Sequence, residues 1–197
     1  MYGGQMTCAR ATGWRMLILV LLTPLSTLAA NYDENVDGDL SDLAGAPTAL
    51  LLGLGANTVT ATSERNDPDF LTISVPNGSR LDAIILDAFT GTPVSFVGVQ
   101  NGPTWTEGTG TNIDPANLLG WAHFGENLAV DLLVDIGAGD GAHGFDPPLS
   151  SGDYTLLLQE RRSAVTYAMN FNVSVPEPSS ITLAATWLGW LVFFRRP

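Results

Sequence analysis

The chain of 197 residues contains no lysine, and its single cysteine is Cys8. Its positive charge comes from 8 arginines alone against 20 acidic residues, which gives a formal net charge of −12. This imbalance argues against nucleic acid and anionic membrane as partners, and it suits a divalent cation or a basic partner. Residues 9–197 contain no cysteine, so they can form neither a disulfide nor a thiolate metal site.

The sequence also lacks short motifs that mark catalytic sites. There is no Gly-x-Ser-x-Gly nucleophile elbow, and the glycine-rich stretch 137–144 leads into neither a lysine nor a helix pattern, as a phosphate-binding loop would. His123 and His143 have no partner at metal-ligand spacing. We therefore expect no enzyme, although a pair of carboxylates for glycoside hydrolysis would be visible only in three dimensions.

Residues 1–30 predict a cleaved secretion signal. Arg10 and Arg15 form a basic region, Met16–Leu22 is an apolar run, and Pro24 ends it. The small residues of 26–30 then provide a cleavage site close to the start of the body at residue 31. The alternative is an N-terminal anchor that is retained.

The end of the chain, residues 176–197, has three parts. A Pro-Glu-Pro triplet stops any strand or helix, because proline lacks an N–H and fixes φ. Ile181–Phe194 carries no charge and predicts a helix, which two terminal arginines close. Positive charge stays on the cytoplasmic side, so the body before the triplet is expected outside. The run is shorter than the ~20 residues of a usual span, and a buried helix of the body is the alternative.

This order of parts resembles the PEP-CTERM sorting signal of exopolysaccharide-producing Gram-negative bacteria. The resemblance implies a protein that is held briefly in the inner membrane and recognised by an exosortase. That enzyme would cut the tail near the triplet and pass the body to the cell surface or the extracellular matrix. The motif residues are Pro176, Glu177, Pro178, Arg195 and Arg196.

Between the two signals, residues 31–175 form one acidic domain with 19 acidic residues against 4 arginines. Turn residues separate nine short candidate strands, which predicts an all-β body: a β-sandwich, with a jelly roll as the nearest alternative. Leu81–Phe89 also fits a helix by pattern, but turn residues on both sides favour a strand. The candidate strands are Ala49–Leu54, Asn57–Thr62, Phe70–Val75, Leu81–Phe89, Val94–Gln100, Leu118–Phe124, Leu128–Ile136, Tyr154–Glu160 and Tyr167–Val175.

A second resemblance runs through this body. Asp67 and Asp69 precede Phe70, the strand ends in Val-Pro-Asn-Gly at 75–78, and Leu81 opens the next strand. Together with the late Gly-Asp-Tyr strand at 152–154, this resembles the pre-peptidase C-terminal domain. The resemblance implies a β-sandwich that serves as a non-catalytic accessory of exported proteins.

The best candidate site is the acidic segment 31–42. Oxygen ligands alternate around a glycine, as in the first half of an EF-hand loop, and Ca²⁺ requires such hard oxygens close together. Ala44 stands where an EF-hand has its glutamate, so we expect a looser calcium loop or a solvated acidic lead-in to the first strand. A second pair, before Phe70, is either a calcium site or turn chemistry. The candidate ligands are Asp33, Asn35, Asp37, Asp39, Asp67 and Asp69.

Trp105 lies between threonine, proline and glycine residues, which predicts an exposed ring that could stack on a glycan, whereas Trp121 is expected in the core. The sequence therefore predicts an exported, non-catalytic surface or extracellular-matrix protein with a structural or adhesive role in exopolysaccharide or biofilm. The alternative is a calcium-dependent carbohydrate-binding module.

Overall fold

The computed structural model of the chain describes residues 28–91 and 94–177. The expected signal peptide lies almost wholly outside these residues, as does the tail from Pro178 onward. No helix in the described part is long and apolar enough to cross a membrane. The elements are β1 (Asn31–Asp33), α1 (Glu34–Asp37), β2 (Thr48–Leu51), β3 (Gly55–Ser63), β4 (Asp69–Thr90), β5 (Ser95–Asn101), η1 (Gly110–Asn112), η2 (Pro115–Asn117), β6 (Gly120–Phe124), α2 (Leu132–Gly137), β7 (Leu149–Gln159) and β8 (Val165–Ser174).

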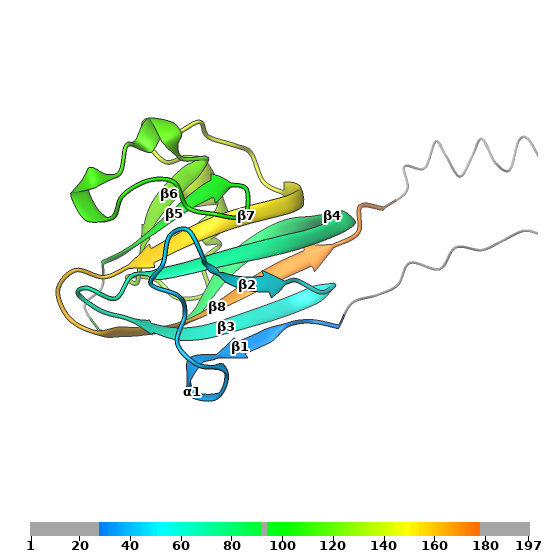
Figure 1. Cartoon of the computed structure of the whole chain (residues 1–197). Coiled ribbons are helices and arrows are strands. Elements are labelled where there is room, and N and C mark those ends of the chain that lie inside the picture. Colours follow the sequence, from blue (N-terminus) through cyan, green and yellow to red (C-terminus); the bar gives the residue numbers. More distant parts are fainter. Residues whose placement is uncertain (1–27, 92–93, 178–197) are drawn as a thin grey trace, which may run out of the picture.

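The strands form one large mixed sheet in the order β1-β3-β8-β4-β7-β5-β6, with β2 beside β4. β1 is parallel to β3 and β2 is parallel to β4, while the other pairs are antiparallel. The body is therefore mostly β, as the sequence predicts. The long strand β4 connects the two halves of the sheet (Figure 1).

β4 folds back on itself and divides the sheet into two layers. It begins at Asp69 opposite Leu158 of β7 and ends at Thr90 opposite Thr166 of β8. Leu158 and Thr166 flank the short β7–β8 loop, so both ends of β4 lie at the same end of the body. The chain reverses near Gly78, whose φ of 79° favours glycine. One layer contains β1, β3, β8 and the second half of β4, and the other contains β2, its first half, β7, β5 and β6, which gives a β-sandwich-like body.

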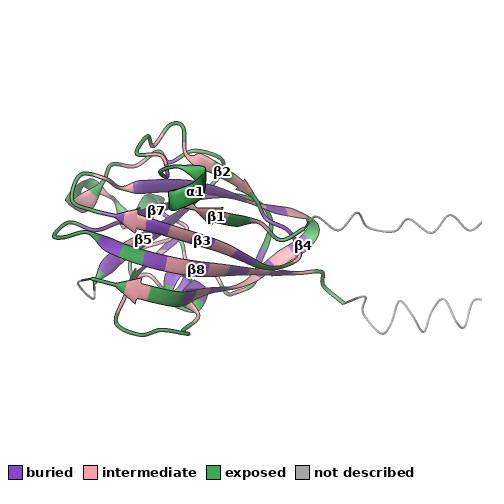
Figure 2. Ribbon diagram, turned by 90° about the horizontal axis from the view of Figure 1, so that it is seen from below, coloured by how far each residue is buried: buried purple, intermediate pink, exposed green. Residues whose placement is uncertain are grey.

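The main core lies between these layers. Along β8, buried residues alternate with more exposed ones, and the inward set is Val165, Tyr167, Met169, Phe171 and Val173 (Figure 2). This period of two is what a strand with one face on the core requires. Burying each large apolar side chain contributes roughly 1.5–3 kcal/mol, so the alternation fixes which face of β8 points inward.

A smaller core covers the outer face of the β7 layer. Phe70 and Leu157 point away from the main core and pack with Trp105 and Leu118 from the segment that follows β5. The central strand β7 is therefore buried on both faces along its second half. This explains why the middle of that half, residues 156–158, is a run of three leucines rather than an alternating pattern.

The strand expected at Leu128–Ile136 is wrong, because the structure has the helix α2 there. Asp131 caps this helix: its carboxylate accepts hydrogen bonds from the backbone N–H groups of Leu133 and Ile84, both at 3.0 Å. The second bond ties the helix to β4. The apolar residues follow helical spacing, and those that are buried are Leu132, Leu133 and Ile136.

The body has two distinct ends. We call the end formed by residues 28–31, 53–57 and 173–177 the terminal pole, because both described chain ends leave from it (Figures 1 and 2). There Ala30 donates a backbone hydrogen bond to Asn57, and Gly55 pairs with Val173. The opposite end, formed by residues 64–68, 109–112 and 160–164, is the loop pole. β8 spans its 10 residues between the two, a length of about 30 Å at ~3.4 Å per residue.

Candidate metal centre

β4 begins with an acidic side chain that the fold buries completely. Asp69 has no exposed surface, and Tyr167 of the opposite layer donates its hydroxyl to Asp69 Oδ2 at 2.7 Å. Asp69 Oδ1 has no hydrogen-bond partner within residues 28–91 and 94–177. Because a buried polar atom without a partner costs free energy, this oxygen marks the place where a ligand is expected.

The N-terminal segment is folded against the start of β4. Asp33 accepts a hydrogen bond from the backbone N–H of Asn35 at 3.0 Å and so caps the single turn of α1. Gly38, with a φ of 96°, then redirects the chain. The carbonyl of Ser41 accepts a hydrogen bond from the backbone N–H of Phe70 at 2.8 Å. The residues just before Ser41 are thereby held next to Asp69.

Glu34 joins this segment to the other layer. Its Oε2 accepts a hydrogen bond from the backbone N–H of Thr62 in β3 at 2.6 Å, and its Oε1 accepts one from Leu40 at 3.2 Å. Tyr32 adds a further constraint, because its hydroxyl donates to the carbonyl of Gly38 at 2.7 Å. The carboxylate of Glu34 is therefore fixed by backbone groups on two sides.

These constraints bring three carboxylates together. One oxygen each from Glu34, Asp39 and Asp69 lies within 4.8 Å of the others. The ion pair found in the described part of the chain, between Arg80 and Asp82 at 2.8 Å, belongs to the β4 turn near the terminal pole. The three carboxylates are therefore not neutralised by an arginine.

The protonation of the cluster reflects this repulsion. Burial raises the pKa of Asp69 to about 8, although the hydrogen bond from Tyr167 lowers it. The charges of Glu34, Asp67 and Asp39 raise it further. Burial also raises the pKa of Glu34, against its backbone hydrogen bonds, and the pKa of Asp67, to which the charge of Asp39 adds. Near neutral pH, Asp69 thus holds either a proton or a cation.

A hard divalent cation fits this donor set. Ca²⁺ takes six to eight oxygen ligands in flexible geometry, and carboxylates supply part of such a shell while water and carbonyl groups supply the rest. A cation would give the unpartnered Asp69 Oδ1 a ligand bond and would offset the mutual repulsion of the three carboxylates.

Two of the residues expected from the sequence, Asp39 and Asp69, belong to this cluster. Asp33 instead caps α1, and Asp37 Oδ2 accepts a hydrogen bond from the backbone N–H of Asp33 at 2.9 Å. Glu34 was missed. An alternating pattern selects every second residue of an extended chain, whereas the turn of α1 points the residue next to Asp33 toward the sheet. Asn35 is exposed on that turn, and Asp67 lies beside the cluster as a neighbouring charge.

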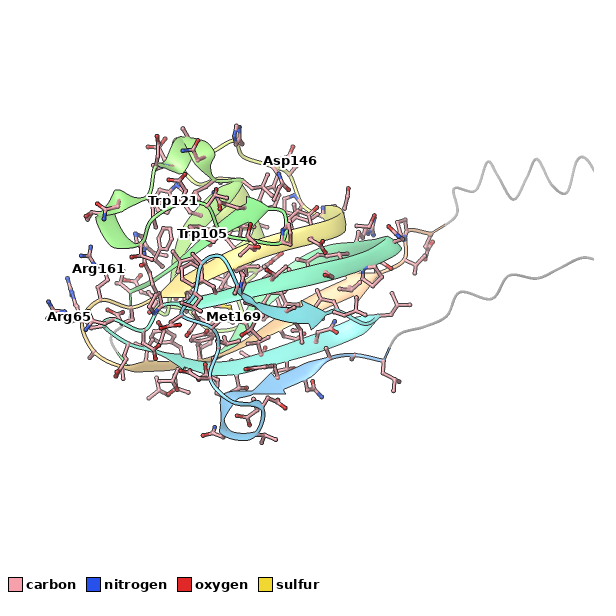
Figure 3. All side chains as sticks on the ribbon, in the orientation of Figure 1. Arg65, Trp105, Trp121, Asp146, Arg161 and Met169 are labelled. Carbon is pink, nitrogen blue, oxygen red and sulfur yellow. The ribbon has the colours of Figure 1, made fainter. Side chains whose placement is uncertain are left out.

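Both tryptophans pack against the smaller core, Trp105 as a buried member and Trp121 at its edge (Figure 3). Trp105 is only 3% exposed, lies 6.2 Å from the ring of Phe70 and donates its indole N–H to Gly108. The expectation of an exposed Trp105 is therefore wrong. Trp121 is half-buried and stacks on Phe96, with ring centroids 6.0 Å apart. Packing decides exposure here: the segment after β5 needs a large apolar side chain to cover the outer face of β7.

The sorting motif falls at the edge of the described chain. Pro176 and Glu177 follow β8 as exposed residues without regular structure. Pro178, Arg195 and Arg196 lie outside the described residues. Neither a protein-family model nor a curated protein matches this sequence.

Proposed function

We propose that the chain is an exported, non-catalytic surface or extracellular-matrix protein that an exosortase sorts through the C-terminal signal. The observation that carries this proposal is the position of the triplet. Pro176 and Glu177 follow the end of β8 at the terminal pole, and both are exposed. An enzyme could reach them there without unfolding the body. Cleavage there would leave every described strand and every described core residue in the body.

The fold-back of β4 supports the proposed accessory β-sandwich. The reversal occurs in the Val-Pro-Asn-Gly stretch, 75–78, that carries the resemblance to the pre-peptidase C-terminal domain, and Asp69 is the first residue of β4. Such domains present a surface rather than a reaction centre, which agrees with the proposed structural or adhesive role.

The carboxylate cluster suits an ion better than a substrate. Close carboxylates are also what glycoside hydrolysis requires. However, Asp69 has no exposed surface, and both oxygens of Glu34 already accept backbone hydrogen bonds. A sugar could therefore not reach the pair, whereas a cation could. The second candidate function, a calcium-dependent carbohydrate-binding module, is favoured by this cluster.

The intact mass of the native protein from the producing cells and their medium tests the sorting proposal. A mass that begins near residue 31, ends near Pro176 and carries additional glycan or acceptor mass is the expected result. A protein that keeps Arg195, Arg196 and Pro197 would contradict it, because the tail would then be an anchor rather than a cleaved signal.

A further inference from the structure

A polar cavity lies at the loop pole, separate from the carboxylate cluster. Its volume is about 660 Å³, and three segments line it: 64–68 between β3 and β4, 109–112 around η1, and 159–162 at the end of β7. Figure 3 shows Arg65 and Arg161 projecting at this end of the body, away from both chain ends. Apart from Pro68 and Gly110, every residue of the lining has a polar or charged side chain.

The cavity collects positive charge in an otherwise acidic protein. It is lined by Arg65, Arg161 and Arg162, which are three of the four arginines in residues 31–175. All three are exposed, and the ion pair found among the described residues involves the fourth, Arg80. Three guanidinium groups on neighbouring loops repel one another, so an anion would stabilise the arrangement.

The lining keeps a net positive charge, because its three arginines outnumber its two acidic residues, Glu64 and Glu160. Glu160 is 4% exposed, and its Oε1 accepts the backbone N–H groups of Arg161 and Arg162 at 2.6 and 2.7 Å. Its Oε2 accepts the hydroxyl of Ser95 at 3.2 Å. The carboxylate is thus directed into the fold, where it shapes the loop that presents the two guanidinium groups. Glu64 remains as the exposed carboxylate on the rim.

The opposite wall is held in place by hydrogen bonds. The backbone N–H of Gly110 donates to Gln159 Oε1 at 3.0 Å, and Trp105 donates to the carbonyl of Gly108 at 3.0 Å. A Cβ at Gly110 would lie 3.1 Å from the guanidinium carbon of Arg161, so that group packs directly over the glycine. The cavity is therefore built before a ligand arrives, which lowers the entropy cost of binding.

We propose that this cavity binds an acidic oligosaccharide that carries carboxylate groups. Arginines recognise carboxylates through paired hydrogen bonds, and the remaining lining offers hydroxyl and amide groups that suit the hydroxyls of a sugar. These groups belong to Asn66, Thr109, Thr111 and Asn112. The inference deepens the proposed function and rests on it only for the orientation of the body. If the body is attached through its terminal pole, the cavity lies about 30 Å from the attachment point, the length of β8 at ~3.4 Å per residue.

The test is calorimetric titration of the full-length chain, in mild detergent, with oligogalacturonate. Excess EDTA is present so that a bridging cation cannot account for binding. The test variants are Arg65→Gln and the double variant Arg161→Gln/Arg162→Gln. Arg80→Gln is the control matched to Arg65→Gln, because each removes one positive charge and Arg80 lies near the terminal pole. Neutral malto-oligosaccharide, sulfated dextran and polyglutamate are the comparison ligands.

We expect oligogalacturonate to bind, to bind more weakly as salt is added, and to lose at least about tenfold in affinity in the double variant while Arg80→Gln keeps the wild-type affinity. Equal losses in all variants would overturn the proposal, as would wild-type affinity in the double variant. No binding, or equal binding of the neutral sugar, would also overturn it. Binding of polyglutamate or sulfated dextran as tight as that of oligogalacturonate would overturn the assignment of a carboxylated sugar. None of these results depends on tail cleavage, so the intact-mass experiment fails or succeeds independently.

Discussion

Two polar side chains with no exposed surface, Asn57 at the terminal pole and Asp69 beside the loop pole, make very different sets of hydrogen bonds. At the terminal pole, Asn57 has no exposed surface and makes five hydrogen bonds. Its Oδ1 accepts from Gly53 and Ala30, while its Nδ2 donates to three backbone carbonyls, one of them that of Phe171. Beside the loop pole, the side chain of the equally buried Asp69 accepts one hydrogen bond, and its Oδ1 has no partner among the described residues.

The difference separates a structural residue from a site. Asn57 is neutral and its hydrogen bonds are complete, so nothing further is needed to explain it. Asp69 is acidic, lies beside two other carboxylates, and has one side-chain oxygen without a hydrogen-bond partner among the described residues. This oxygen is therefore a place where a cation can bind. The other buried side-chain oxygen without a partner in the described residues is Asn170 Oδ1. It belongs to a neutral, half-buried amide outside the carboxylate cluster, so it suggests no cation.

The largest expected effect is at the terminal pole. Asn57→Ala leaves several buried backbone groups without partners, and we expect a loss of about 4 kcal/mol in the free energy of unfolding. Urea denaturation measures it, with and without calcium. The loss should be the same in both conditions, because Asn57 is remote from the cluster. A loss below about 1 kcal/mol would show that the network does not hold the N-terminal segment.

The next effect is at the carboxylate cluster of Glu34, Asp39 and Asp69. Calcium at about 100 times its Kd should stabilise the wild-type protein by about 2.7 kcal/mol, because a ligand bound only by the folded state adds to its stability. Asp69→Asn keeps the shape of the side chain and an acceptor for Tyr167 but removes the charge. We expect the calcium effect to disappear in this variant, measured as the shift in Tm. Equal shifts in both proteins would place the cation elsewhere.

The pH dependence sharpens the same contrast. In excess EDTA, the folded protein keeps a proton on Asp69 up to about pH 8, while the unfolded chain releases it near pH 4. The folded state then binds more protons, so stability falls as pH rises between these values, by up to about 1.4 kcal/mol per pH unit for this group. Burial and neighbouring charges act in the same direction on Glu34 and Asp67. Asp69→Asn should flatten the fall between about pH 6 and pH 8, which urea denaturation at each pH would show.

The smallest effect belongs to the helix cap. Asp33→Ala removes the N-cap of α1 and should cost about 1 kcal/mol. Calcium should still stabilise this variant, because Asp33 is outside the cluster. Loss of the calcium effect here, with Asp69→Asn unaffected, would favour the loop expected from the sequence over the cluster seen in the structure.

The sequence predicted the fold where local chemistry and long-range packing agree. Turn residues around 76–79 and 90–93 correctly favoured a strand for Leu81–Phe89 over a helix. The same reasoning failed at α2, where the cap by Asp131 and the helical spacing of Leu132, Leu133 and Ile136 were present but were outweighed by an apolar run that also suits a strand. The same apolar run fits a strand or a helix, and the packing of its side chains against the rest of the protein decides which of the two forms.

The candidate site was predicted in part for a similar reason. Acidic residues near Gly38 and before Phe70 were visible as candidate ligands, and Asp39 and Asp69 do meet. That they meet across 30 residues depends on the pairing of Ser41 with Phe70, which no local pattern encodes. The inclusion of Glu34 depends on one turn of helix and on Thr62 in another strand.

The central claim is that the unpartnered oxygen of Asp69 marks a cation site, and a calcium titration of the full-length protein near pH 7, with proton release followed in the same experiment, tests it most directly. We predict that a single calcium ion binds per chain and displaces about one proton, because Asp69 must ionise to become a ligand, and that Asp69→Asn abolishes both signals. Absence of calcium binding in the wild-type protein, or binding that Asp69→Asn leaves unchanged, would contradict the claim.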